Sequence, residues 1–193
     1  MIVYLHGFNS SPQSHKAEVL RRHLQSRGCG GALQVPGLSH WPREAVAQAA
    51  NVIEAHLGKQ PVCLVGSSLG GYYATWLAER YDLRAVLINP AVRPYRLLTD
   101  YLGTQSNPYT GEVYELTREH MAQLRSLEVA ELSEPRRFLV LLQTGDEVLD
   151  YRDALEFYAS AHCRVTEGGD HAYRDFETVV EELLRFCGDA VTR

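Results

Sequence analysis

The feature that most constrains the fold is a Gly-x-Ser-x-Gly motif, in which Gly66, Ser68 and Gly70 occupy the fixed positions. A short apolar run rich in β-forming residues ends at Gly66, and a stretch compatible with a helix begins just after Ser68. A serine at the tip of a sharp strand-to-helix turn has a strained backbone, and the residues two before and two after it crowd each other. The motif therefore predicts a nucleophile elbow, the alternative being an ordinary glycine-containing turn with incidental serines.

Entry into a helix after this motif also orients a backbone amide. The N–H of Leu69 is expected to point toward the space beside the Ser68 hydroxyl, where an anion can be held. If the motif is an elbow, the rest of the chain must supply a base, an acid and a second amide donor.

Apolar runs and helical patterns alternate along most of the chain. This alternation predicts right-handed βαβ crossovers and an α/β fold with a sheet of about six mostly parallel strands and helices on both faces. Catalytic residues in such a sheet gather just beyond the carboxyl ends of the strands. The predicted strands are residues 2–5, 32–35, 61–65, 85–88, 138–142 and 164–166, and the predicted helices are residues 12–27, 42–57, 69–80, 151–160 and 173–187.

The alternation breaks after the fourth predicted strand, at residues 91–135. This segment contains several tyrosines, a turn-prone stretch at 107–111 and a helical pattern near 117–127, for which Thr117 is a plausible cap. An insertion of this length between two sheet strands is usually a lid or a pocket wall, although covering a sheet edge is an equal alternative. We therefore expect a single domain, residues 1–193, with a helical insertion at about 91–135.

Two polar side chains follow strands in the positions that an elbow requires. Asp146 comes four residues after Leu142, and His171 lies in the loop after the last predicted strand. The order Ser68, Asp146, His171 is the order associated with a nucleophile elbow. His171 Nε2 is expected to accept the serine proton, while Asp146 holds the imidazole through Nδ1.

Other carboxylates compete for the role of the acid. Asp150 is better placed to cap the helix that begins near Tyr151. Glu147 is expected to be solvated, and Asp100, within the insertion, is a more remote alternative. We prefer Asp146 because it follows its strand more closely and has a turn glycine before it.

The second amide donor is expected in the loop after the first strand, at His6-Gly7-Phe8. Gly7 permits the required backbone, and the Phe8 N–H can face the Leu69 N–H across a pocket. His6 is expected to brace this loop rather than to act as the base, because His171 has the better position in the chain.

Composition and the remaining motifs exclude several classes of protein. The chain of 193 residues has a formal net charge of −5 and no block of like charges, so it lacks the surface expected for binding nucleic acid or an anionic membrane. No apolar run approaches the ~18 residues of a membrane span, and the N-terminus does not resemble a signal peptide. Cysteines are scattered without a Cys-x-x-Cys pair and are expected to be reduced, which predicts a cytoplasmic location. No metal-binding motif, dinucleotide fingerprint or Walker A loop is found, so neither a metal nor a cofactor is predicted.

Longer blocks of sequence resemble the YqiA-type esterases, compact proteins with an α/β-hydrolase fold. The resemblance covers the chain from the first strand to the last helix. It is carried by His6-Gly7-Phe8-Asn9-Ser10-Ser11-Pro12, Gly66-Ser67-Ser68-Leu69-Gly70-Gly71-Tyr72-Tyr73-Ala74-Thr75-Trp76, Asn89-Pro90-Ala91-Val92-Arg93-Pro94, Leu98-Thr99-Asp100-Tyr101-Leu102-Gly103, Gln143-Thr144-Gly145-Asp146-Glu147-Val148-Leu149-Asp150-Tyr151 and Glu167-Gly168-Gly169-Asp170-His171.

This resemblance implies an α/β-hydrolase fold and hydrolysis of acyl esters or acyl thioesters, with Ser68 as nucleophile, Asp146 as acid and His171 as base. It also implies that the segments 89–94 and 107–111 lie near the pocket. Candidate pocket residues are His6, Asn9, Tyr72, Asn89, Arg93, Tyr101 and Tyr109.

The sequence thus predicts a serine esterase that acts on a small-molecule acyl ester or thioester through an acyl-enzyme on Ser68. Two alternatives stay open: a non-catalytic binding protein on a hydrolase scaffold, and a thioesterase or amidase with the same triad. The sequence does not predict the oligomeric state.

Overall fold

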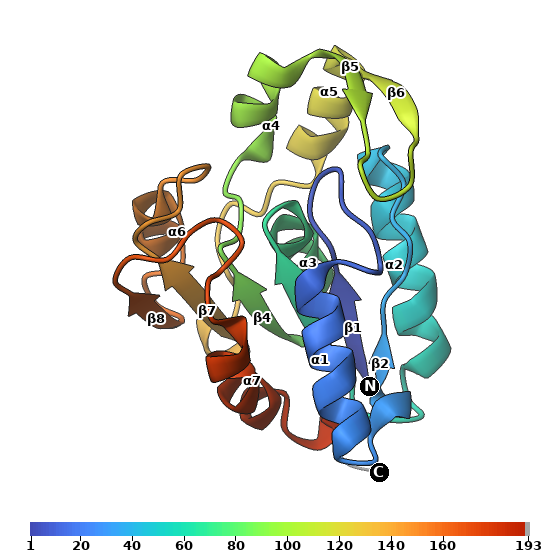
Figure 1. Cartoon of the computed structure of the whole chain (residues 1–193), viewed down its shortest axis with the longest axis vertical. Coiled ribbons are helices and arrows are strands. Elements are labelled where there is room, and N and C mark those ends of the chain that lie inside the picture. Colours follow the sequence, from blue (N-terminus) through green and yellow to red (C-terminus); the bar gives the residue numbers. More distant parts are fainter. Residues whose placement is uncertain (192–193) are drawn as a thin grey trace.

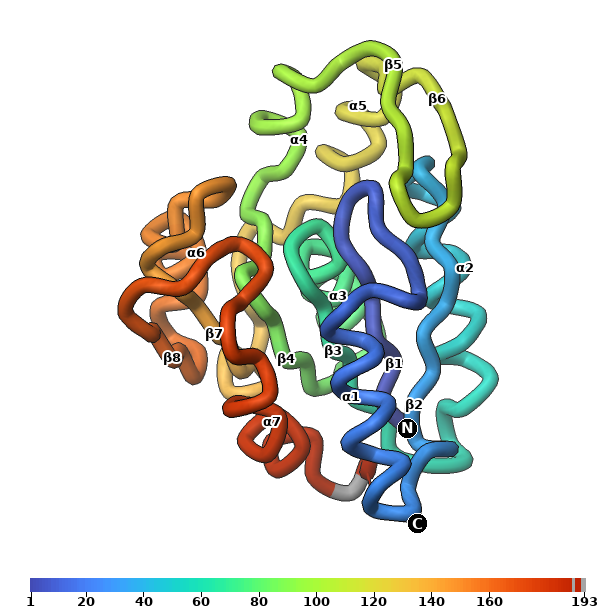
Figure 2. Tube along the Cα trace, viewed as in Figure 1, coloured from blue at the N-terminus to red at the C-terminus, as the bar shows by residue number. Residues whose placement is uncertain are grey.

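A computed structural model of the chain describes residues 1–191 and places a six-stranded sheet at its centre (Figures 1 and 2). The strand order is β2-β1-β3-β4-β7-β8, and every neighbouring pair is parallel. This architecture confirms the predicted fold class. The strands are β1 (Ile2–Leu5), β2 (Leu33–Gln34), β3 (Cys63–Ser67), β4 (Arg84–Ile88), β7 (Phe138–Gln143) and β8 (His162–Thr166).

The register brings the carboxyl ends of the central strands to one edge of the sheet. Leu5 lies opposite Gly66, and Ser67 lies opposite Ile88. At the far side, Gln143 lies opposite Thr166. Loops that follow these strands therefore meet at a common rim, toward which the arrows point in Figure 1.

Helices cover both faces of the sheet. The face in front in Figure 1 carries α1 (His15–Ser26) and α7 (Val180–Cys187), whose apolar residues pack on Ile2, Tyr4 and their neighbours. The opposite face carries α2 (Pro42–His56), α3 (Leu69–Tyr81) and α6 (Tyr151–Phe157), which share a core with Val3 and Leu5. Strands buried on both faces explain the continuous apolar runs seen in the sequence.

Local signals placed several helix ends correctly. Pro42 occupies the first turn of α2, and the Asp150 carboxylate accepts a hydrogen bond from the Arg152 amide at the start of α6, as expected of a cap. Two starts were predicted too early. The first helix begins at His15 because the Ser14 amide donates to the Ser11 carbonyl in a preceding turn. The last helical segment begins only at 176, because Asp175 has a φ of 58°, which no α-helix tolerates.

The insertion contains a β-hairpin that the sequence did not predict. After α4 (Pro94–Leu97) come the antiparallel strands β5 (Gly103–Ser106) and β6 (Val113–Leu116), followed by α5 (Arg118–Ser126) with Thr117 as its cap. Figures 1 and 2 show the hairpin beside the loop that follows β1. The insertion is therefore only partly helical.

Candidate active site

Ser68 lies at the turn between β3 and α3 with a φ of 55° and a ψ of −121°. Two glycines make this strained turn possible. A Cβ on Gly66 would overlap the carbonyl oxygen of Gly70, as the motif predicts. A Cβ on Gly70 would instead overlap the carbonyl oxygen of Leu5 in β1, so the second glycine is required by the neighbouring strand.

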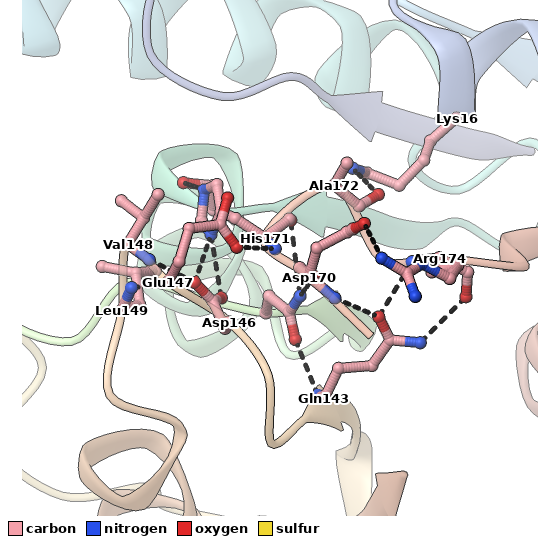
Figure 3. A network of polar contacts seen from close by, with 12 residues as sticks. Lys16, Gln143, Asp146, Glu147, Val148, Leu149, Asp170, His171, Ala172 and Arg174 are labelled. Carbon is pink, nitrogen blue, oxygen red and sulfur yellow. Dashed lines mark hydrogen bonds and ion pairs between the residues drawn. The ribbon is translucent and has the colours of Figure 1, made fainter. Parts of the chain in front are cut away.

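The structure brings Ser68, His171 and Asp146 together in one chain of hydrogen bonds. His171 Nε2 lies 3.0 Å from Ser68 Oγ, and His171 Nδ1 lies 2.8 Å from Asp146 Oδ2 and 2.9 Å from Oδ1. Because Nδ1 faces a carboxylate, it carries the proton, and Nε2 is left to accept from the serine hydroxyl. The imidazole and carboxylate are labelled in Figure 3.

The Asp146 side chain is only 2% exposed, yet its environment favours the charged form. Burial by itself would raise the pKa of this carboxyl group. The hydrogen bond from His171 and those from the Leu149 and Val148 amides, at 2.8 and 2.9 Å, outweigh burial and lower the pKa below its ordinary value. Asp146 is therefore a buried anion that can stabilise an imidazolium.

The alternative acids occupy other positions. Asp150 is the cap of α6, and Asp100 is exposed in the insertion. Glu147 is exposed, as expected, and its Oε2 also accepts a hydrogen bond from the His171 amide at 3.0 Å. That bond is the main cause of a lowered pKa at Glu147.

A buried asparagine holds the loop at residues 167–175, which follows β8 and carries His171 and is called the histidine loop below. Asn89, 2% exposed, follows β4 with a φ of 40°. Its Nδ2 donates to the carbonyls of Asp170 at 3.0 Å and His171 at 3.3 Å, and its Oδ1 accepts from the Gln143 amide. Asn89, a predicted pocket residue, is thus placed under the loop, with its side-chain amide occupied by backbone partners.

Gln143 fixes the same loop from the end of β7 and was missed by the sequence analysis. Its Oε1 accepts from the amides of Asp170 at 3.1 Å and Arg174 at 2.8 Å, and its Nε2 donates to the Arg174 carbonyl at 2.8 Å (Figure 3). The sequence does contain a signal for this role, because Gln143 is a polar residue at the end of an otherwise apolar strand. A Cβ on Gly169 would overlap the Gln143 amide, which explains a glycine there.

Lys16 of α1 reaches the loop from its other side, and no sequence motif predicts this role. Its Nζ donates to the Ala172 carbonyl at 2.8 Å (Figure 3). Burial lowers the pKa of Lys16 to about 8, against the opposing attraction of Asp170 and Asp146. The histidine loop is therefore held by side chains from several separate elements.

The two predicted amide donors belong to residues that line a common small cavity. Phe8 and Leu69 line a space of about 30 Å³. Within residues 1–191, neither of their amides donates a backbone hydrogen bond, so both are free for a ligand. A Cβ on Gly7 would lie 3.3 Å from the Ser68 Cβ, which shows how closely the loop approaches the serine. Leu69 is the first residue of α3, where the helix dipole favours negative charge.

His6 is buried and has both ring nitrogens engaged. Its Nδ1 lies 3.1 Å from the Gly7 carbonyl oxygen, and its Nε2 accepts a hydrogen bond from the Leu38 amide at 3.2 Å. Burial lowers the pKa of this imidazole. The side chain is therefore arranged as a brace of the loop, as the sequence analysis expected.

The other predicted pocket residues are dispersed. Tyr72 is buried and donates to the Leu124 carbonyl, and Arg93 forms an ion pair with Glu128 at 3.2 Å. These two side chains line one cavity of about 20 Å³.

Tyr101 and Tyr109 are 47% and 54% exposed, so the structure places these two candidate pocket residues at the surface. Tyr109 lies in the hairpin turn, where the Asn107 Oδ1 accepts from its amide, and this turn directs the residue toward solvent.

A cavity of about 620 Å³ lies between the insertion and α6. It reaches Val148 and Leu149, the residues whose amides donate to Asp146. Its lining mixes apolar side chains such as Leu132 and Phe157 with charged ones.

Among residues 1–191, no group of three or more His, Cys, Asp or Glu side chains is placed to hold a metal ion. In the same part of the chain, no helix has both the length and the apolar character needed to cross a membrane.

Solved structures share this architecture. Est1E from Butyrivibrio proteoclasticus, solved with ferulic acid bound, superposes with a TM-score of 0.70 at 13% identity, covering 100% of this chain and 89% of that one. The alpha/beta hydrolase domain-containing protein 10 from mouse gives a TM-score of 0.67 at 16% identity, covering 95% of this chain and 89% of the other. With its parallel sheet and serine elbow, the chain has the fold of the α/β hydrolases.

Sequence comparison gives the family. Residues 1–188 match the "Uncharacterised protein family (UPF0227)", and the chain belongs to this family. It is 25% identical over 190 residues to a UPF0227 protein of Citrobacter koseri, covering 96% of this chain and 98% of that protein. It is 26% identical over 190 residues to the YcfP protein of Salmonella paratyphi B, with the same coverage. The family membership expected from the sequence blocks is thereby confirmed.

Proposed function

We propose that the protein is a serine hydrolase that cleaves acyl esters or acyl thioesters through an acyl-enzyme on Ser68. One observation carries the proposal: the hydrogen-bonded chain Ser68–His171–Asp146 ends at an elbow, and the nearby amides of Phe8 and Leu69 donate no backbone hydrogen bond within residues 1–191. These are the parts that acyl transfer requires, namely a nucleophile, a base with an orienting acid, and donors for an oxyanion.

In the first half of the proposed reaction, Ser68 Oγ attacks the acyl carbonyl as its proton passes to His171 Nε2. The imidazolium so formed is stabilised by Asp146, whose lowered pKa keeps it ionised at neutral pH. The carbonyl oxygen becomes negative in the tetrahedral intermediate and accepts hydrogen bonds from the Phe8 and Leu69 amides. When the bond to the leaving group breaks, His171 returns the proton to the departing oxygen or sulfur.

In the second half, a water molecule replaces the leaving group. His171 Nε2 accepts a proton from this water, and the resulting hydroxide attacks the acyl carbon held on Ser68. A second oxyanion forms at the same two amides and collapses with release of the carboxylic acid. The serine regains its proton from the imidazolium, which restores the starting state.

The insertion lines a cavity next to residues that hold Asp146. We propose that the insertion at 91–135 forms a pocket wall, since Leu97 and Leu132 of the insertion line the 620 Å³ cavity that also reaches Leu149. Structural neighbours described as esterases include the esterase domain of a Rhodothermus marinus protein, with a TM-score of 0.66 at 18% identity over 94% of this chain and 83% of that one.

The proposal is tested by turnover of p-nitrophenyl acetate and butyrate with wild type and Ser68→Ala. We expect the variant to lose at least ~10³-fold in kcat, because the nucleophile is removed. Equal rates would reject Ser68 as the nucleophile. Tight binding of a small ester without turnover by the wild type would instead favour a binding protein on this scaffold.

The bond that is cleaved can be determined with matched substrates. An oxygen ester, a thioester and an anilide with the same acyl group are compared at equal concentration. We expect ester and thioester to be cleaved and the anilide to be far slower. Faster cleavage of the anilide would assign the protein to the amidases.

A further inference from the structure

The loop that carries the proposed oxyanion donor has little support of its own. Residues 7–10 follow β1 and form one tight turn at residues 8–9, and among residues 1–191 no backbone–backbone hydrogen bond joins them to another segment. His6 contributes one contact, to the Gly7 carbonyl oxygen. A loop with so few internal bonds has low local stability unless other segments hold it.

Three hydrogen bonds to this loop come from the hairpin of the insertion. The Tyr114 hydroxyl donates to Asn9 Oδ1 at 2.8 Å, and Asn9 Nδ2 donates to Gln105 Oε1 at 3.2 Å. Asn107 Nδ2 donates to the Ser10 carbonyl at 2.9 Å. Figures 1 and 2 show the hairpin and the loop side by side.

Asn9 is the residue through which the hairpin acts on the loop. It has a φ of 48°, a conformation that asparagine tolerates better than most residues, and it directly follows Phe8. Both ends of its side-chain amide are occupied by hairpin residues. The orientation of the Phe8 amide is therefore tied to the position of the hairpin.

Tyr114 is itself held firmly. Its ring stacks on His40 with centroids 4.1 Å apart. His40 Nδ1 in turn lies 3.0 Å from Nε2 of His120, which is fully buried in α5. The hydroxyl that reaches Asn9 is thus presented by a rigid group of aromatic rings.

We propose that the β5–β6 hairpin is the brace of the oxyanion loop and that Tyr114 and Asn9 are positioning residues for the Phe8 amide. This inference rests on the proposed esterase function and assigns a role to the insertion within it. The hairpin acts during catalysis by keeping a donor in place.

The matched pair of variants is Tyr114→Phe and Tyr95→Phe. The first removes the hydroxyl that reaches the loop. The second removes a hydroxyl of the same insertion that bonds to Glu128 at 3.0 Å, away from the loop. Both keep the ring, so each removes one hydrogen bond without leaving a large cavity.

The first readout is the ratio of kcat/KM for an oxygen ester over that for the matching thionoester, in which the carbonyl oxygen is replaced by sulfur. Sulfur is a weaker hydrogen-bond acceptor than oxygen. The ratio therefore reports how strongly the Phe8 and Leu69 amides donate hydrogen bonds to the oxyanion. A ratio measured on one preparation is independent of the fraction of folded enzyme. We expect Tyr114→Phe to lower it about tenfold, less than the ~10²- to 10³-fold loss of a whole donor, with KM for the ester unchanged.

The second readout does not depend on activity. The ¹⁵N order parameters of the Phe8 and Asn9 amides are expected to be near the rigid value of ~0.85 in wild type and to fall toward ~0.6 in Tyr114→Phe. Tyr95→Phe should leave both readouts at the wild-type values. Asn9→Gly, which keeps the positive φ, should resemble Tyr114→Phe, and the double variant should be no worse than either single one.

The outcomes separate the two proposals. Unchanged order parameters and an unchanged ester ratio in Tyr114→Phe, with an active wild type, would overturn the brace. An equal effect of Tyr95→Phe would also overturn the brace. That result would mean that loss of any hydrogen bond in the insertion increases the mobility of the loop. A third outcome is that the wild type neither hydrolyses esters nor reacts with a fluorophosphonate at Ser68, while the Phe8 order parameter still falls in Tyr114→Phe. In that case the brace stands and the esterase function fails.

Discussion

The contacts of Gln143 allow one prediction to be worked out in detail. Gln143→Met keeps the length of a side chain that is only 4% exposed but removes its bonds to the amides of Asp170 and Arg174 and to the Arg174 carbonyl. Taking roughly 1 kcal/mol for each of these hydrogen bonds, the free energy of unfolding should fall by about 3 kcal/mol. For a chain of this length, that corresponds to a decrease in Tm of about 6–12 °C.

The same substitution should impair activity more than stability alone explains. The lost bonds leave the loop free to shift His171 relative to Ser68, and a displacement of about 1 Å in a reacting group costs up to ~10² in rate. We expect kcat per titrated active site to fall about 100-fold.

The assays are urea unfolding and ester hydrolysis, with Gln25→Met as the control. Gln25 is exposed on α1, and its replacement should change the free energy of unfolding by no more than ~0.5 kcal/mol. If Gln143→Met unfolds at the same urea concentration as the control and hydrolyses the ester at the wild-type rate, the reasoning about the loop is wrong.

Three further predictions follow from single contacts. Asp146→Asn should lower kcat by about 10⁴ with little change in KM, since an amide no longer holds the required tautomer of His171; steady-state kinetics at neutral pH checks this. Gly66→Ala should fail to give a stable protein, because its Cβ would overlap the Gly70 carbonyl oxygen; a melting temperature within a few degrees of wild type would contradict the packing described. Lys16, whose pKa falls from 10.5 to about 8 on folding, binds fewer protons in the native state than in the unfolded state between those values. The stability of the wild type should therefore rise from pH 8 to pH 10.5 relative to Lys16→Met, and parallel pH profiles in urea unfolding would refute the assignment.

Much of the fold was predictable because its signals are local. The apolar runs gave the strands, and the Gly-x-Ser-x-Gly spacing located the turn at Ser68. The rule that functional groups follow the carboxyl ends of parallel strands then selected Asp146 and His171 from many acids and histidines. The structure places these side chains within hydrogen-bond reach of one another.

The supporting residues were not predictable because their partners depend on strand order. Asn89 and Gln143 can hold one loop only because β4 and β7 are neighbours, and the sequence separates them by 54 positions. The hairpin was missed for a related reason. Its strands are short and half exposed, so their alternation is weak, and the tyrosines around it were interpreted as a pocket. Tyr114 instead contacts the loop after β1.

Covalent labelling tests the central claim most directly. The protein is incubated with a fluorophosphonate, and the intact mass and the labelled peptide are determined for wild type, Ser68→Ala and His171→Ala. We predict one label per chain, on Ser68, with no label in Ser68→Ala and much slower labelling in His171→Ala, because the hydroxyl then lacks its base. Labelling of a different residue, or labelling of Ser68 at the same rate without the imidazole, would contradict the account.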